Sequence, residues 1–245
     1  MSIKTKIDFS LVIPCFNEAD NLPGLLKRCD KLLKLKKFEL ILINNGSNDE
    51  TKKIFKKLKK FKNLKLINIK KNIGFGSGVM KGLKSSRGKI IGYTHADRQT
   101  DPLDFYKCIK KIDLSKNEKI FFKGNRINKL KNGWTYFDIF LTLSQSIFQS
   151  IFLFTFMHDI HSQPNIFSKS LIKYKKSYPR DFLIDTYFYY LAKKHNYKIN
   201  KFDVVFNKKF RGFGSGNNDT FLKNVKGIFQ HIIGTFVLIK ILMSN

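Results

Sequence analysis

The chain has 245 residues, of which 42% are hydrophobic and 14% aromatic. That length accommodates one large domain or two small ones, and that composition supplies a sizeable core and excludes a disordered chain. The formal net charge of +29, carried by 41 Lys and six Arg, indicates either a polyanionic partner or a drift of composition toward Lys, Ile, Asn and Phe.

Four strand–loop–helix units are predicted within the first hundred residues. Apolar runs typical of strands lie at 9–14, 39–43, 64–69 and 89–94, and each is followed by a polar or Gly-rich loop. Helices are expected over about 22–35, over about 48–61, up to about Ser86, and from Pro102 onward. Ser47 and Glu50 have the spacing of a capping box for the second helix. This alternation predicts a parallel sheet with helices on its faces, whose ligands bind at the carboxyl ends of the strands.

The second half of the chain is less regular. A strand is expected at 118–125, a helix at 181–195 and a second strand at 198–206. Residues 139–157 carry no charge, yet four polar residues recur on one side at helical spacing: Thr142, Gln145, Ser146 and Gln149. This pattern predicts an amphipathic helix, packed in the core or lying on a membrane, in preference to a membrane span.

The last apolar segment covers residues 225–243. Its uncharged stretch, 227–239, is shorter than the roughly 20 residues that a span needs. On a protein of charge +29, a helix with an apolar face and lysines around it is expected to lie on anionic lipid. Packing on the domain and a dimer contact are the alternatives.

The string from Thr94 to Gln99 directly follows a predicted buried strand. His95, Asp97 and Gln99 alternate there and offer an imidazole, a carboxylate and an amide oxygen. A hard divalent cation that bridges a diphosphate takes mostly oxygen ligands and few protein groups. The string therefore indicates either a metal site or a capped strand end with a solvated Asp.

The Gly-rich loop after the third strand contains Gly74, Gly76 and Gly78. Such a loop before a helix indicates phosphate contact at the helix N-terminus or, equally, tight packing of the helix against the sheet. A dinucleotide fingerprint would need G-x-G-x-x-G after the first strand, so its spacing and position are wrong for that class of site.

Other polar residues follow predicted strands. Those after the first two strands could bond a base and ribose or act as loop and cap residues: Asn17, Glu18, Asn44, Asn45 and Ser47. Arg126 follows a later strand, and Arg211 lies beside a second Gly-rich loop, where cations suit phosphate oxygens. His158, Asp159 and His161 share one loop and are candidate bases or exposed loop residues.

Taken in order, these segments resemble family 2 glycosyltransferases with a GT-A fold and, among them, the polyprenyl-phosphate sugar transferases. The strings that carry the resemblance are LVIPCFNEADNL, ELILINNGSNDET and NIGFGSGVMKGLKSSRGKIIGYTHADRQTDP. The match is specific over about 9–102 and looser to about 216. It implies an α/β, GT-A (Rossmann-like), mostly parallel sheet flanked by helices over residues 1–216. The resemblance does not cover the C-terminal amphipathic segment, 217–245, whose membrane association is expected from its own residues.

The resemblance also implies roles for individual residues. It implies a donor pocket lined by Pro14, Asn17, Glu18, Asn45, Gly46, Gly74 and Gly76. It implies that His95, Asp97 and Gln99 hold Mg²⁺ or Mn²⁺ against the donor diphosphate. It implies that Arg126, Arg211 and Ser215 lie near donor or acceptor phosphates.

Three departures from the family pattern stand out. Asn44-Asn45 replaces the usual paired Asp of the second loop, and His95 replaces the first Asp of the Asp-x-Asp motif. Ser162-Gln163-Pro164-Asn165 replaces a Ser-Gly-Phe-type sequence. These departures bear on base recognition, on the strength of metal binding and on the acceptor.

The expected function is an inverting, metal-dependent transfer of a sugar from a nucleotide-sugar donor to a lipid-linked acceptor in cell-envelope glycan synthesis. A lipid phosphate is already ionised and needs no strong base, whereas a sugar hydroxyl would need one, for which Asp159 is the candidate; a phosphate acceptor would rely on Arg126 instead. The first residues lack the apolar run of a signal peptide, and three scattered Cys fit a reducing compartment, so the cytoplasmic face of the membrane is the expected location.

Two alternatives belong to other classes of protein. The charge of +29 favours a nucleic-acid-binding protein, which would expose aromatic residues among its basic ones. The Lys-rich helix at 48–61 instead turns its Phe residues to the apolar face, so nucleic acid is not the expected partner. A catalytically inactive relative that binds sugar nucleotides is the other alternative, motivated by Asn44-Asn45 and His95.

Overall fold

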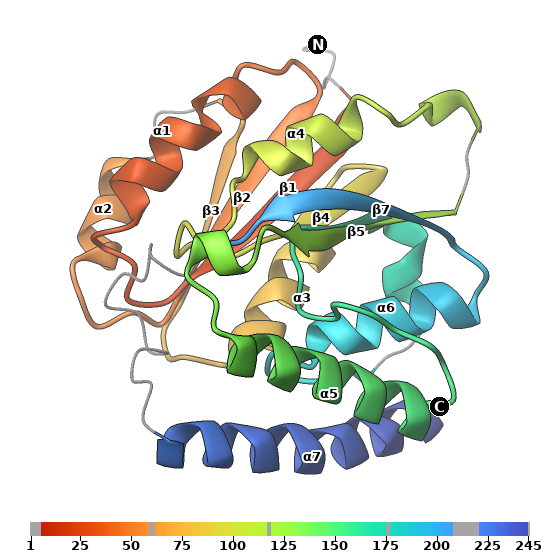
Figure 1. Ribbon diagram of the computed structural model, residues 1–245. Helices are drawn as coiled ribbons and strands as arrows, with labels where there is room; N and C mark the ends of the chain where they lie inside the picture. The colour runs from red at the N-terminus through yellow and green to blue at the C-terminus, as the bar shows by residue number, and fades with distance from the viewer. Residues whose placement is uncertain (1–5, 59–61, 117–118, 175–176, 208–220, 245) are drawn as a thin grey trace.

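The computed structural model describes residues 6–58, 62–116, 119–174, 177–207 and 221–244. A seven-stranded sheet lies at its centre, with the strand order β3-β2-β1-β4-β6-β5-β7 (Figure 1). The strands are β1 (Phe9–Cys15), β2 (Phe38–Asn45), β3 (Leu64–Ile69), β4 (Ile90–Tyr93), β5 (Ile120–Ile127), β6 (Asn165–Ser168) and β7 (Lys198–Val205).

Strands β1 to β4 pair in parallel, which confirms the predicted alternation of strands and helices. Their carboxyl ends therefore meet at one edge of the sheet. Strand β6 runs antiparallel to both β4 and β5, while β7 pairs in parallel with β5. The sequence analysis missed β6, because its four residues follow a polar loop and are too few to show an alternating pattern.

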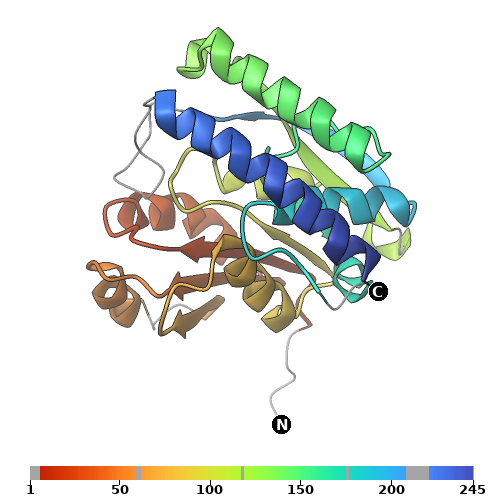
Figure 2. The same cartoon turned by 90° about the horizontal axis from the view of Figure 1, so that it is seen from below.

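Helices cover both faces of the sheet (Figure 1). The α-helices are α1 (Leu22–Leu33), α2 (Thr51–Lys57), α3 (Phe75–Ser85), α4 (Leu103–Ile109), α5 (Tyr136–Phe152), α6 (Ile184–Lys194) and α7 (Phe221–Met243). Three short 3₁₀ turns complete the described elements: η1 (Leu114–Lys116), η2 (Leu130–Asn132) and η3 (Lys169–Lys173). Helices α5 and α7 lie side by side beneath α3 and α6 and form an extra layer on that face (Figures 1 and 2).

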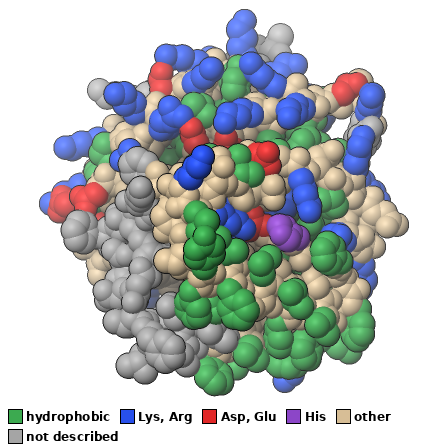
Figure 3. Space-filling view, viewed as in Figure 1, with side chains coloured by type: hydrophobic (Ala, Val, Ile, Leu, Met, Phe, Trp, Pro, Cys, Tyr) green, Lys and Arg blue, Asp and Glu red, His purple; other side chains and the backbone are tan. Residues whose placement is uncertain are grey.

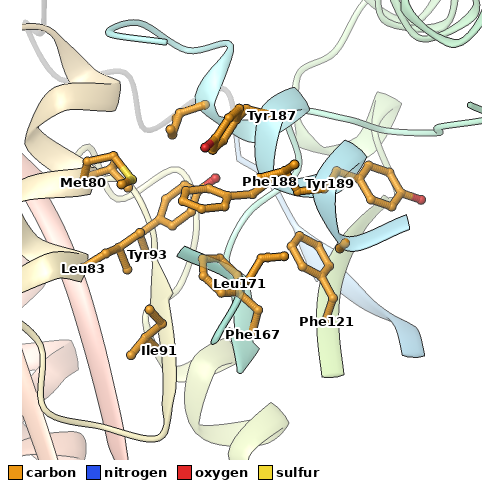
Figure 4. Close-up of a cluster of buried hydrophobic side chains, with 14 of the residues drawn as sticks. Met80, Leu83, Ile91, Tyr93, Phe121, Phe167, Leu171, Tyr187, Phe188 and Tyr189 are labelled. Atoms are coloured by element: carbon orange, nitrogen blue, oxygen red, sulfur yellow. The ribbon is translucent and has the colours of Figure 1, made fainter. Parts of the chain in front are cut away.

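Two apolar clusters hold the layers together. Side chains alternate across a strand, so Leu11 and Ile13 of β1 pack toward α1 and α4, while Val12 packs toward α3. The cluster on the α3 and α6 face contains stacked rings, among them Phe121 and Phe167 (Figure 4). Strands buried on both faces in this way appear in the sequence as continuous apolar runs.

Helix α2 is shorter than the predicted 48–61, and its predicted capping box does not form. The side chain of Glu50 makes no cap hydrogen bond. The Oγ of Ser47 instead accepts the backbone N–H of Asn17 at 3.1 Å, and the Thr51 N–H donates to Asp49. Ser47, which the spacing predicted to cap this helix, therefore joins the loops after β1 and β2 instead.

Helix α7 confirms the predicted C-terminal amphipathic helix. The expected boundary between residues 216 and 217 lies outside the described residues. Inside them, α7 is bonded to α5, because Gln145 contacts His231 at 2.8 Å and Gln149 contacts Thr235 at 3.3 Å. Among the described residues, no helix combines the length and apolar character that crossing a bilayer requires.

Candidate active site

The loops after β1 and β2 are joined by hydrogen bonds at the carboxyl edge of the sheet. Besides the contact between Asn17 and Ser47, the N–H of Glu18 donates to Thr51 Oγ1 at 2.9 Å. In return, the N–H of Asn48 donates to Asn17 Oδ1 at 3.0 Å. Asn17 has a positive φ of 56°, a conformation that Asn tolerates better than most residues. These contacts place two residues of the expected donor pocket, Asn17 and Glu18, in one rigid unit.

Asn45, a third expected donor contact, is buried at the end of β2. Its amide nitrogen donates to Asn72 Oδ1 at 3.2 Å and to the carbonyl of Gly74 at 3.1 Å. The neighbouring Gly46 has a φ of +75°, and a Cβ there would lie 2.3 Å from the Asn72 backbone nitrogen. Asn45 therefore ties the second loop to the Gly-rich loop, and Gly46 permits the close approach. Pro14, at the end of β1, is buried as well.

The glycines of the third loop lie under the segment that precedes α6. A Cβ at Gly74 would approach the carbonyl oxygen of Arg180 to 2.3 Å, and one at Gly76 would approach that of Pro179 to 2.4 Å. The N–H of Ser77, in the first turn of α3, donates to the Arg180 carbonyl at 3.3 Å. These contacts favour tight packing, the alternative explanation for Gly74 and Gly76, because a protein carbonyl occupies a position that a phosphate would need.

The expected metal ligands follow β4, and two of them, His95 and Asp97, make contacts within the protein. Asp97 Oδ1 accepts the backbone N–H of Gln99 at 3.0 Å. The ring of His95 stacks on Phe75 with centroids 4.9 Å apart, and Phe75 stacks in turn on Phe182 at 4.8 Å. Within the described part of the chain, no group of three or more His, Cys, Asp and Glu side chains could hold a metal ion.

Glu18 supplies a second carboxyl near Asp97. Burial raises the pKa of Glu18 to about 7, and the charges of Asp97 and Asp49 add to the rise, against a hydrogen bond from Asn21 that lowers it. A cation between these carboxyls would relieve their repulsion. Carboxylate oxygens are also the ligands that Mg²⁺ and Mn²⁺ prefer. The chemistry of Asp97 and Glu18 therefore fits a divalent cation.

Arg126 and Asp159, the two expected catalytic residues, form a buried ion pair. Arg126 donates to Asp159 from its backbone nitrogen at 2.7 Å and from Nε at 2.7 Å, and its guanidinium lies 4.7 Å from the Trp134 ring centre. Lys129 Nζ is 3.7 Å from the same carboxylate. Burial alone would raise the pKa of Asp159, but the charge and hydrogen bonds of Arg126 outweigh it and lower that pKa. Asp159 is therefore a stable carboxylate and a weak base.

Asp185 at the start of α6 is a residue that the sequence analysis missed. Its buried carboxylate accepts hydrogen bonds from Tyr93 at 2.7 Å, Asn165 at 2.9 Å and Gln163 at 3.1 Å, and it faces His161 Nδ1 at 3.3 Å. Burial opposes its ionisation, but the bond with His161 and nearby positive charge lower its pKa overall. In the sequence this residue resembles an ordinary acid in the first turn of a helix, so nothing marks it out.

Lys123 in β5 is the second missed residue. Its buried ammonium donates to the carbonyl of Ile160 at 2.6 Å, to that of Ser162, and to Asn165 Oδ1 at 2.8 Å. Burial lowers its pKa to about 8. Lys123 thus fastens the loop that carries His158 and Asp159 to the sheet. The sequence did offer one signal for Lys123, because a charged residue directly follows the apolar residues of the run IFFK. Arg211 and Ser215 lie outside the described residues.

Solved structures share this architecture. A glucosyl-3-phosphoglycerate synthase from Mycobacterium tuberculosis in complex with UDP superposes with a TM-score of 0.68 at 14% identity, over 96% of this chain and 81% of that one. TarS 1–349 from S. aureus gives 0.55 at 19% identity, over 80% and 58%. The fold and the carboxyl-edge site thus define an α/β protein of the GT-A class.

The chain belongs to glycosyl transferase family 2, whose family model matches residues 10–174. It is 34% identical to a dolichyl-phosphate beta-glucosyltransferase from Dictyostelium discoideum, over 44% of this chain and 38% of that protein. It is 28% identical to a dolichol-phosphate mannosyltransferase from Pyrococcus furiosus, over 52% and 36%. The matched part thus spans less than half the length of these relatives. The family resemblance of the sequence is confirmed.

Proposed function

We propose that this chain is an inverting, metal-dependent glycosyltransferase that moves a sugar from a nucleotide-sugar donor to a lipid-linked acceptor, a polyprenyl phosphate or a lipid-borne glycan, in cell-envelope glycan synthesis. One observation carries most of the proposal: within a family 2 sheet, Glu18 after β1 and Asp97 after β4 both lie at the carboxyl edge, where the charge of Asp97 adds to the raised pKa of Glu18. The names of the curated relatives, with dolichyl and undecaprenyl phosphates among their substrates, support a lipid acceptor.

On the donor side, the joined first and second loops hold the nucleotide. Asn17 and Glu18 offer polar groups there, with Pro14, Asn45 and Gly46 shaping the floor beneath them. Asp97 and Glu18 would hold Mg²⁺ or Mn²⁺, which neutralises the donor diphosphate and makes it a better leaving group. His95 and Gln99 would flank that cation, His95 with its ring fixed by Phe75.

On the acceptor side, the ion pair of Arg126 and Asp159 supports a phosphate acceptor over a sugar hydroxyl. A hydroxyl needs a base in order to attack, and Asp159 is held as a weak one. A phosphate oxygen is already ionised and needs attraction instead. Arg126 and Lys129 supply positive charge beside a single buried carboxylate, and Asp159 keeps Arg126 in place.

The proposed location is the cytoplasmic face of a membrane, where a peripheral protein of charge +29 meets anionic lipid. Binding of nucleic acid gains no support from helix α2, because Phe55 is buried beneath its lysines. A catalytically inactive relative remains the second candidate, since Asn45 is occupied by bonds within the protein and His95 packs against Phe75.

Transfer from a panel of nucleotide sugars to polyprenyl phosphate tests the proposal, together with calorimetry of donor binding in Mn²⁺. We expect Asp97→Asn to abolish the Mn²⁺-dependent part of donor binding and His95→Asp to preserve it. Asp203→Asn, which changes a carboxyl bonded to Asn125, is the matched control and should bind as the parent does. Donor binding without any transfer would favour the inactive relative, and unchanged binding by Asp97→Asn would exclude the metal assignment.

A further inference from the structure

Helix α5 has its two faces reversed relative to an ordinary surface helix. The side chains of Ser146 and Gln149 face the protein and are buried, Gln149 with 0% exposure. The side chains of Phe140, Ile147 and Ile151 face outward with exposures of 62%, 59% and 62%. Helices that pack on a water-soluble protein normally bury the apolar side and expose the polar one. This helix therefore matches an apolar medium on its outer side.

The inward polar side of α5 is fully engaged. Gln149 accepts a hydrogen bond from Thr186 of α6 at 3.0 Å and donates to Thr235 of α7 at 3.3 Å. Buried polar groups that find partners cost little, whereas the same groups unpaired would be expensive. A half-turn of α5 that buried its apolar side would break these bonds, so the outward position of Phe140, Ile147 and Ile151 is fixed by the structure.

Gln145 extends this polar contact to α7. Its amide nitrogen lies 2.8 Å from His161 Nε2 and 2.8 Å from His231 Nδ1. Burial and the neighbouring His161 lower the pKa of His231 to about 4, so its ring is neutral at physiological pH. Helices α5 and α7 are therefore joined by a hydrogen bond that involves a neutral His231.

We define the outer helical face by six exposed side chains: Phe140, Ile147 and Ile151 of α5, and Phe229, Ile233 and Val237 of α7. The 17 residues of α5 and 23 of α7 span about 25 and 34 Å as helices. The two helices run side by side in both ribbon views. Figure 3 shows hydrophobic side chains gathered over the lower part of the molecule, where these helices lie, and Lys and Arg gathered over the upper part.

We propose that the outer helical face inserts into the surface of a lipid bilayer, with α5 and α7 lying in the plane of the membrane. This inference rests on the proposed function, because a lipid-linked acceptor must be reached at a membrane. It adds that α5 contacts lipid as fully as α7 does, and that apolar insertion, more than the net charge, drives the binding.

The end of α5 supplies the reason to choose a bilayer over a second copy of the chain. Phe154, just beyond the helix, is 96% exposed, and Phe156 is 74% exposed with Lys193 Nζ 6.0 Å from its ring centre. Lys201 lies close enough to Lys193 to lower the pKa of that ammonium, although burial lowers it more. Aromatic rings bordered by lysines suit the boundary between acyl chains and anionic phosphate groups.

Flotation of the full chain with vesicles tests this proposal. We expect binding to neutral phosphatidylcholine vesicles that survives high salt, and tighter binding when phosphatidylglycerol is added. Phe140→Asn with Ile147→Asn should reduce partitioning at least about tenfold, since each replaces a large apolar contact. The matched control, Leu130→Asn with Val205→Asn, changes two exposed apolar residues away from this face and should float as the parent does.

Three results would overturn the proposal. In the first, the parent protein stays in the soluble fraction and does not float with vesicles. In the second, both double variants lose vesicle binding to the same extent. In the third, light scattering without vesicles shows a dimer that Phe140→Asn with Ile147→Asn converts to a monomer, while that variant still floats. The vesicles contain neither donor nor acceptor, so flotation is independent of sugar transfer. Retained flotation without transfer would count against the proposed function alone.

Discussion

Polar and apolar side chains are placed in opposite ways in two regions of the molecule. One region is the half of the sheet formed by β1 to β4, and the other is the layer formed by α5 and α7. In the first region, apolar side chains such as Leu42 fill the interior and lysines cover the helices. In the second, Gln149 and Ser146 lie inside while Phe140 and Ile147 face outward. Both regions belong to one chain and pack on one sheet. An amphipathic pattern therefore defines two faces of a helix without saying which medium each face meets.

The difference lies in what holds each region together. Nonpolar burial stabilises the first region, where the ion pair of Arg28 with Asp101 lies on the surface. In the second region, directed polar contacts specify how the helices seat, and the ion pair of Arg126 with Asp159 beside them is buried. Replacements of the same chemical kind should therefore have different consequences in the two regions.

The largest contrast is expected between two arginines. Arg126→Ala leaves the Asp159 carboxylate buried without its main partner, a change that typically costs about 3–5 kcal/mol. Arg28→Ala removes an exposed ion pair and should cost at most about 1 kcal/mol. Urea denaturation of both variants measures the free energy of unfolding. Equal losses would mean that Asp159 is solvated or rescued by Lys129, and the comparison of the two pairs would fail.

The next contrast concerns apolar residues. Leu42→Ala in the sheet should lower the free energy of unfolding by about 2–5 kcal/mol, because it opens a cavity in the core. Ile147→Ala on the outer helical face should change it by less than about 0.5 kcal/mol in the absence of lipid. Thermal and urea unfolding, each without vesicles, provide the test. A loss above about 2 kcal/mol for Ile147→Ala would show that this face is packed in solution.

Two glutamines, one buried in α5 and one exposed on α7, allow a further comparison of buried and exposed sites. Gln149→Leu places a hydrophobic residue at a buried site, yet it should destabilise the fold by about 1–3 kcal/mol, because the Thr186 hydroxyl loses its acceptor. Gln230→Leu on the exposed side of α7 should have little effect. Unfolding curves for the two variants decide the matter. Stabilisation by Gln149→Leu would contradict the polar interior assigned to this layer.

The smallest effect is a dependence on pH in the first region. The folded pKa of Glu18 is about 7, above the roughly 4.3 of an unfolded Glu, so the fold binds that proton more tightly. The stability of the parent should therefore fall as pH rises from about 4.3 to 7 and then level off. The Gln side chain of Glu18→Gln cannot ionise, so the Tm of this variant should rise relative to the Tm of the parent as the pH increases from about 4.3 to 7.

Added Mn²⁺ provides the companion measurement for Glu18. If Glu18 and Asp97 share a cation, Mn²⁺ should raise the Tm of the parent near pH 8 and narrow its difference from Glu18→Gln. Asp203→Asn serves as the control and should respond to pH and Mn²⁺ as the parent does. A Tm difference that does not vary with pH would contradict the raised pKa of Glu18.

The alternating half of the fold could be predicted from the sequence because its signals are local. Continuous apolar runs indicated the strands, the loops after them indicated the carboxyl edge, and three strings within residues 11–102 carried the family resemblance. The bonds between loops could not be predicted. Ser47 and Glu50 have the spacing of a helix cap, and only the approach of the first loop turns Ser47 toward Asn17.

The partners of Arg126 and Asp185 illustrate why part of the site escaped prediction. Arg126 and Asp159 were each expected near the chemistry, but 33 positions separate them, and their pairing depends on how the loop after α5 folds back. Asp185 bonds Tyr93 from 92 positions away, and Lys123 bonds Asn165 from 42 positions away. Charged residues that pair with one another across the fold produce no periodic pattern in the sequence.

The hydrogen bonds between the first two loops have a consequence for protein engineering. Because Asn17 bonds both Ser47 and Asn48, and Glu18 bonds Thr51, neither loop can be exchanged without removing partners from the other. A graft that tests the proposed donor-binding role of these loops should therefore carry residues 15–21 and 45–51 together. Libraries that vary either stretch alone are expected to lose hydrogen bonds between the loops, whereas paired diversification preserves them.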